Sequence, residues 1–290
     1  MGDHDPANEH ILSGPPLNSP DPALPTSANP EGRRGLQAVI HLDGFRRLWV
    51  GQIFSQLADK FYIVLMVYLI AQYWVTNTPD GNGALAEIAS AIRMDFETRA
   101  QRITLLATGI YVANTIPAMV LGSVAGVWVD RWPKRRVMVA SNGLRALLVL
   151  CTPLFLIPGP HWFGLSWGYW ALLLMTFLES VLTQFFAPAE QATIPLLVPK
   201  EHLLAANSLY QATSMGATIV GFALGDPILR GLNHLLQTVG INGGEFLLLP
   251  FCYGMAALSL STIQMREPPR KDSSDSVWKE IVAGIQVLRE

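Results

Sequence analysis

Six long apolar stretches dominate the chain between residues 45 and 264, separated by short polar or charged segments. They lie near residues 48–75, 104–128, 137–158, 169–190, 205–227 and 246–264. A helix needs about 20 predominantly apolar residues to cross a bilayer. Helices are favoured over strands, because an open sheet would leave backbone polar groups unpaired in lipid. The pattern predicts an all-α integral membrane protein with six transmembrane helices.

The two ends of the chain differ in composition from the apolar middle. Residues 1–44 are rich in Pro, Asn, Ser and Asp and contain no apolar block, so we expect a disordered cytoplasmic tail. Residues 265–290 end in a segment whose apolar positions fit one side of a helix. This segment predicts the start of a cytoplasmic linker helix after a six-helix transmembrane domain over residues 45–264.

Composition agrees with a membrane protein and argues against an enzyme. Only 14% of the residues are charged, against about 25% in soluble domains. Cys151 and Cys252 both lie inside apolar runs, which favours core packing over a disulfide or a metal site. The sequence contains no Gly-x-Ser-x-Gly, His-Glu-x-x-His or phosphate-binding Gly-x-x-x-x-Gly-Lys-Ser/Thr motif. We therefore expect no catalytic residue, no metal, no cofactor, no nucleic-acid partner and no drive by ATP.

The distribution of basic residues predicts the orientation. If the N-terminus is cytoplasmic, fourteen of the twenty Lys and Arg residues fall in inner segments and four in outer loops. Cytoplasmic loops carry the excess of Lys and Arg in membrane proteins. The sequence therefore predicts a multi-pass protein of the cell (plasma or inner) membrane with both termini in the cytoplasm.

The loop between the second and third apolar runs carries its charges in a defined order. It reads Gly122-Ser-Val-Ala-Gly-Val-Trp-Val-Asp-Arg-Trp-Pro-Lys-Arg-Arg136. Gly122 and Gly126 would allow a neighbouring helix to approach closely. One alternative is that the loop serves only as a topology signal, since bases at this place hold any loop in the cytoplasm.

This loop resembles the signature between the second and third helices of the major facilitator superfamily, with Pro133 where many members have glycine. A second stretch, from Phe185 to Pro199 and on to Leu209, is similar to the fourth-to-fifth helix passage of the macrolide-efflux branch. The resemblance implies the N-terminal half of a major facilitator fold, because full-length members are about twice as long. The chain would then be a truncated frame, a fragment or half of a split transporter. The resemblance implies gating by Gly126, Asp130, Arg131, Lys134, Arg135, Arg136 and Arg145.

Two polar stripes, each centred on an acid, interrupt the first and fourth apolar runs. The first contains Gln52, Ser55, Gln56 and Asp59, and the second contains Thr176, Glu179, Ser180, Thr183 and Gln184. The members of each stripe share one helix face by their spacing. Acids at bilayer depth usually face a wet cavity or a protein interior. We therefore expect both stripes to face one aqueous chamber.

Asp59 and Glu179 are candidates for binding a proton or a cationic substrate, with Gln52, Gln56, Thr183 and Gln184 beside them. Burial disfavours the charged form of a carboxyl group, which is what a proton carrier needs. The alternative is a structural ion pair, for example between Asp59 and Arg145. Arg145 is interpreted as a structural partner of Asp130 or Asp59, with substrate contact as the second reading.

The fifth apolar run carries small residues at Gly216, Ala217, Gly221 and Gly225, which favours close helix packing. This face also resembles the antiporter signature of the superfamily, which has Gly-Pro where this chain has Gly221-Phe222. Packing and a role in antiport both remain open.

The leading interpretation is half of a secondary active transporter that couples efflux of amphipathic or drug-like solutes to protons. The alternatives are a lysophospholipid or other lipid carrier of the same superfamily, and a non-transporting fragment. The implied partners are a small-molecule or lipid substrate, protons, membrane lipid, and a second six-helix half or a second copy.

Overall fold

The computed structural model describes residues 30–74, 96–240 and 243–265, and it is helical apart from one small hairpin. The longer helices are α1 (Pro30–Ile40), α2 (Asp43–Leu69), α4 (Phe96–Arg131), α5 (Lys134–Leu150), α6 (Trp167–Leu197), α7 (Leu203–Gln237) and α8 (Leu248–Ser261). The short elements are the π-helical turn η2 (Ile70–Trp74), the 3₁₀ turns η3 (Thr152–Leu156), η4 (Lys200–His202) and η5 (Gly244–Phe246), and the antiparallel strands β1 (His161–Trp162) and β2 (Leu165–Ser166). Among the described residues, six helical segments are long and apolar enough to cross a membrane, which confirms the predicted six.

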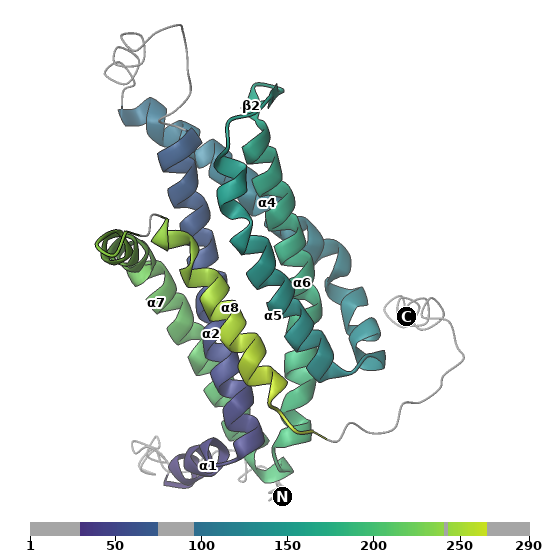
Figure 1. Cartoon of the computed structure of the whole chain (residues 1–290). Helices are drawn as coiled ribbons and strands as arrows, with labels where there is room; N and C mark the ends of the chain where they lie inside the picture. The colour runs from purple at the N-terminus through teal and green to yellow at the C-terminus, as the bar shows by residue number, and fades with distance from the viewer. Residues whose placement is uncertain (1–29, 75–95, 241–242, 266–290) are drawn as a thin grey trace, which may run out of the picture.

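The six long helices form an open row rather than a closed ring. Helix α8 packs between α2 and α5, α6 packs between α5 and α4, and α7 packs on the other side of α2 (Figure 1). Helix α2 makes only minor contact with α4 and α6. We call the end of the bundle with the turn between α4 and α5 the motif end, and the opposite end, with β1 and β2, the hairpin end.

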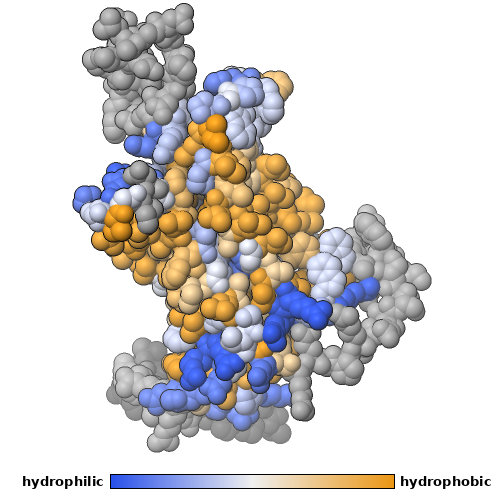
Figure 2. Space-filling model, viewed as in Figure 1, coloured by the Kyte–Doolittle hydropathy of each residue, from blue (hydrophilic) through white to orange (hydrophobic). Residues whose placement is uncertain are grey.

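The surface fits a bilayer around the middle of the bundle. Figure 2 shows a broad hydrophobic band across the visible face, with hydrophilic residues gathered toward the two ends. Large apolar side chains on α4 are exposed: the exposed fraction is 72% for Leu105 and 80% for Met119. Their exposure is what a helix facing lipid or another protein requires.

Buried apolar residues form two clusters with a polar layer between them. One cluster lies toward the hairpin end and includes Leu65, Leu172 and Tyr253. The other lies toward the motif end and includes Phe45 and Phe186. Between them along α2, α5 and α6 come the buried polar residues Gln52, Ser55, Ser141, Asn142, Arg145, Thr176, Glu179 and Ser180.

Helices α4, α6 and α7 are longer than the apolar runs that predicted them. Helix α7 continues past Pro227 to Gln237, ten residues beyond the predicted end of its span at residue 227. An ion pair between Arg230 Nε and Asp226 Oδ2, 2.9 Å apart, bridges one turn of this extension. Hydropathy detects only the part of a helix that contacts hydrocarbon, so it does not detect an extension into polar surroundings.

Part of the predicted disordered tail is a helix, which corrects the prediction for residues 30–40. The apolar residues of α1 are few, but Val39 is completely buried in the cluster at the motif end. Gly35 lies against Ala205 of α7. Docking on the bundle supplies the burial that composition alone does not show. Residues 1–29 and the predicted linker helix after residue 265 lie outside the described residues.

Candidate functional site: a shared arginine between two buried acids

Arg145 of α5 lies at the centre of the polar layer, with its side chain completely buried. Its Nη1 atom is 3.5 Å from Asp59 Oδ1 of α2 and 3.5 Å from Ser55 Oγ. Its Nε atom is 3.8 Å from Glu179 Oε1 of α6. One base is therefore shared by the two acids that the sequence singled out, on helices that otherwise make only minor contact.

Aromatic rings complete the surroundings of the guanidinium group. Its central carbon lies 5.0 Å from the centre of the Phe186 ring and 5.7 Å from that of Tyr253. Tyr253 of α8 also donates a hydrogen bond of 2.8 Å to Asp59 Oδ1. Ring faces attract cations, so both aromatic residues help to hold a charge away from water.

Glu179 is the less satisfied of the two acids. Its side chain is 6% exposed, and neither carboxyl oxygen has a hydrogen-bond partner. At 3.8 Å, its approach to Arg145 is an ion pair without a hydrogen bond. The Asp59 side chain is 24% exposed, so it is the more accessible of the two acids.

The other members of the α2 stripe turn toward α7. Gln52 Nε2 donates to the backbone oxygen of Tyr210 at 3.0 Å, and Gln56 Oε1 accepts from Ser214 Oγ at 3.4 Å. The α2 stripe therefore divides between α7 and Arg145.

The members of the α6 stripe also contact different helices. Thr176 shares a hydrogen bond with Tyr62 of α2, whereas Ser180 donates to the Asn114 backbone oxygen of α4. Thr183 bonds back to the Glu179 backbone oxygen within its own helix. Gln184 lies against Gly122 of α4. Glu179 is thus the member of this stripe that meets Arg145.

The charged motif forms a tight turn between α4 and α5. Asp130 is exposed in the last turn of α4 and makes no ion pair or hydrogen bond within the described part of the chain. Lys134, Arg135 and Arg136 form the first turn of α5. Arg145 lies three turns further along α5 and pairs with Asp59, so of its two predicted partners the structure brings only Asp59 to it.

The close helix contacts lie at two of the predicted glycines. A methyl group added at Gly221 would be 2.3 Å from Lys60 Cβ, and one at Gly225 would be 3.0 Å from Val64 Cγ2. At Gly122 the nearest atom would be 3.6 Å away, and at Gly126 none lies within 4 Å. Among the described helices, α7 therefore approaches α2 closely, and none approaches α4 at Gly126.

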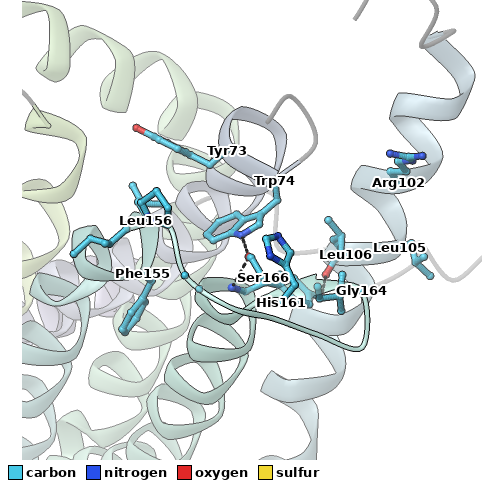
Figure 3. Close-up of a pocket in the computed structure, with 16 residues that line it drawn as sticks. Tyr73, Trp74, Arg102, Leu105, Leu106, Phe155, Leu156, His161, Gly164 and Ser166 are labelled. Carbon is cyan, nitrogen blue, oxygen red and sulfur yellow. Dashed lines mark hydrogen bonds between the residues drawn. The ribbon is translucent and has the colours of Figure 1, made fainter. Parts of the chain in front are cut away.

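A large pocket at the hairpin end contains none of the predicted site residues. It has a volume of about 630 Å³ and lies among η2, η3, the hairpin and the starts of α4 and α6. In Figure 3, the Trp74 side chain donates to Ser166 beside His161, whereas Arg102 stands apart on α4. None of the described residues that line this pocket is acidic, which separates it from the chemistry of the polar layer.

Sequence reasoning missed the contribution of α8. Tyr253 lies in an apolar run without charged residues, and nothing in its spacing points to Asp59, 194 residues earlier. Phe186 likewise looks like an ordinary apolar core residue in the sequence. Only the packing of α8 and α6 around α5 brings these rings to Arg145.

Six membrane-crossing helices with ionisable side chains at mid-depth are the architecture of an integral membrane transporter. The family description "Major Facilitator Superfamily" matches residues 48–289, and the chain belongs to this family. It is therefore a multi-pass membrane protein of a transporter family, and this family is not one of enzymes.

Similar proteins include several efflux pumps. Macrolide efflux protein A of Streptococcus pyogenes is 30% identical over 60% of this chain and 40% of its own length. Macrolide efflux protein A of Enterococcus faecalis is 26% identical over 60% of this chain and 50% of its own. Multidrug efflux pump Tap of Mycolicibacterium fortuitum is 28% identical over 62% of this chain and 42% of its own length. The matched part thus spans half or less of each relative, and no solved structure matches the chain significantly.

Proposed function

We propose that this chain is one half of a proton-coupled transporter that exports amphipathic, drug-like solutes. The observation that carries the proposal is the arrangement of one buried arginine between two acids. With both acids ionised, the group holds one surplus negative charge. A proton or a cationic solute neutralises that charge, so the two compete for the same place.

Glu179 is the better proton acceptor of the pair on geometric grounds. Asp59 is held by hydrogen bonds from Tyr253 and Arg145, whereas the oxygens of Glu179 are not hydrogen-bonded. Protonating Glu179 therefore breaks no hydrogen bond. Asp59, with its more exposed side chain, is the acid that meets a cationic solute.

Transport against pH tests this assignment. The chain is reconstituted in vesicles with a candidate second six-helix half, and a fluorescent cationic dye reports transport under an imposed pH gradient. We expect the wild-type rate to depend on pH and Glu179→Gln to lose that dependence. Glu201→Gln, at an exposed acid of η4, should keep the wild-type profile. An unchanged profile in Glu179→Gln would remove Glu179 from proton coupling.

The proposal includes a partner, either a second six-helix half or a second copy of this chain. Support comes from α4. Its large apolar side chains are exposed, and the Asp130 side chain has no partner among the described residues. An acid beside the N-terminus of a partner helix gains about 0.3–1 kcal/mol. Vesicles that hold at most one copy of this chain each, and no second half, should show no dye transport. Gradient-driven transport by a single copy would contradict the need for a partner.

We also propose that the motif end faces the cytoplasm, because the cluster of bases lies there.

A further inference from the structure

A third buried acid, Glu190, lies on α6 toward the motif end, outside the polar layer. It is 1% exposed and lies next to Ala189, a member of the apolar cluster at that end. The Tyr210 hydroxyl of α7 donates to its Oε2 atom at 2.9 Å. Its Oε1 atom is buried and has no hydrogen-bond partner.

No base neutralises this carboxyl group at contact distance. The charged or titratable groups that act on it from the neighbouring helices are Tyr210 of α7, Asp59 of α2 and Arg145 of α5. Arg145 forms its ion pairs within 4.0 Å with Asp59 and Glu179 and not with Glu190. Within the described residues, Glu190 therefore has one neutral donor and no cation in contact.

An isolated carboxylate in apolar surroundings is too costly to remain charged, and such groups take up a proton instead. For Glu190, a proton from water at the motif end would form an O–H bond on Oε1 and cancel the carboxylate charge. Oε2 would then be the carbonyl oxygen that accepts from Tyr210.

Glu190 is also connected to the polar layer. Glu179, Phe186 and Glu190 follow one another at i, i+7 and i+11, so they share one face of α6. Eleven residues of helix span about 16 Å. Phe186, whose ring lies under the Arg145 guanidinium, stands between the two acids on this face. Gln52 of the polar layer binds the backbone oxygen of Tyr210.

We propose that Glu190 is a second proton-binding site, protonated in this conformation, between the motif end and the shared arginine. Its use in transport rests on the proposed proton coupling, whereas its protonation does not.

Infrared spectroscopy of the purified chain in lipid nanodiscs at neutral pH tests the protonation without any transport assay. A protonated carboxylic acid gives a C=O stretching band that an ionised one lacks. We expect Glu190→Gln to remove one such band from the wild-type spectrum. The control Glu201→Gln, an exposed acid near the same end, should leave the bands unchanged.

Tyr210→Phe provides a second measurement that keeps the acid in place. Removing the hydroxyl donor should move the Glu190 band to higher wavenumber without abolishing it. Wild-type and Glu190→Gln spectra that agree in this region, with equal helix content by circular dichroism, would overturn the proposal. A Tyr210→Phe spectrum with no shift would overturn the assigned hydrogen bond. Neither outcome depends on Glu179 or on efflux.

Discussion

At the residue scale, the interior of the bundle holds Arg145 and the acids Asp59, Glu179 and Glu190, and it satisfies them unequally. Asp59 has two donors, Glu190 has one, and Glu179 has none. The Nε and Nη2 atoms of Arg145 also lack hydrogen bonds. Buried ion pairs add stability only when good geometry offsets their desolvation. Because the geometry here is loose, the group is better suited to exchanging a proton than to holding the fold together.

Removing the base should nevertheless be costly, because it leaves the acids without a counter-charge. We expect Arg145→Met to lower the free energy of unfolding by about 3 kcal/mol. The same substitution in a chain that also carries Asp59→Asn and Glu179→Gln should recover most of that loss. Unfolding in mixed micelles, followed by circular dichroism, measures both. Equal losses in the two backgrounds would show that Arg145 acts through packing and not through charge.

The sequence identified the two acids but not how differently they are held. Both acids lie in polar stripes, and the spacing of a stripe shows only that its side chains share one face of a helix. It does not show which residues of other helices contact them. The hydrogen bond from Tyr253 to Asp59 depends on α8 lying beside α2, which no local pattern encodes. Glu190 stands out in the sequence only as an acid, and its hydrogen bond from Tyr210 depends on the position of α7.

At the scale of elements, most of the charges around the turn between α4 and α5 oppose the helix dipoles. Asp130 lies at the C-terminal end of α4 beside the favourably placed Arg131, and three bases lie at the N-terminal end of α5. The dipole favours the opposite placement by about 0.3–1 kcal/mol for each charge. Helix stability therefore does not explain this motif, which leaves topology and contacts with a partner as its physical reasons.

The contact between α2 and α7 depends on Gly221. A methyl group there would lie 2.3 Å from Lys60 Cβ, close to the backbone, so the two helices would have to move apart. We expect Gly221→Ala to destabilise the chain by about 1–3 kcal/mol. Gly216→Ala is the matched control, since nothing lies within 4 Å of the added group. The control should gain about 0.5–1 kcal/mol from helix propensity. Thermal unfolding in detergent that shows no difference between the two variants would contradict the close contact.

At the scale of the whole molecule, the helices form an open row, and the Asp59 side chain in it is 24% exposed. The chain spans half or less of the length of the efflux pumps that it matches. The pocket at the hairpin end is larger than a site for a few waters, yet it contains neither acid.

Thiol labelling in intact cells tests the orientation of the bundle. In a background with Cys151→Ser and Cys252→Ala, Phe163→Cys introduces a thiol on the hairpin, where the native side chain is 96% exposed. Glu201→Cys introduces one at the motif end. We expect a membrane-impermeant reagent to label position 163 in intact cells and position 201 only after permeabilisation. The reverse pattern would place the motif end outside.

The sequence by itself determined that this protein crosses the membrane six times as helices, and it identified the superfamily and the acids at mid-depth. These follow from local quantities: the length of each apolar run, the need to pair every backbone group in lipid, and the order of charges in one loop. Only the tertiary structure decided that Arg145 is shared by Asp59 and Glu179, that Tyr253 and Tyr210 hold two of the three acids, and that Gly221 rather than Gly126 meets another helix of the chain. Such contacts depend on which helices become neighbours and on how each is rotated about its axis. Both are set by the packing of residues far apart in the chain.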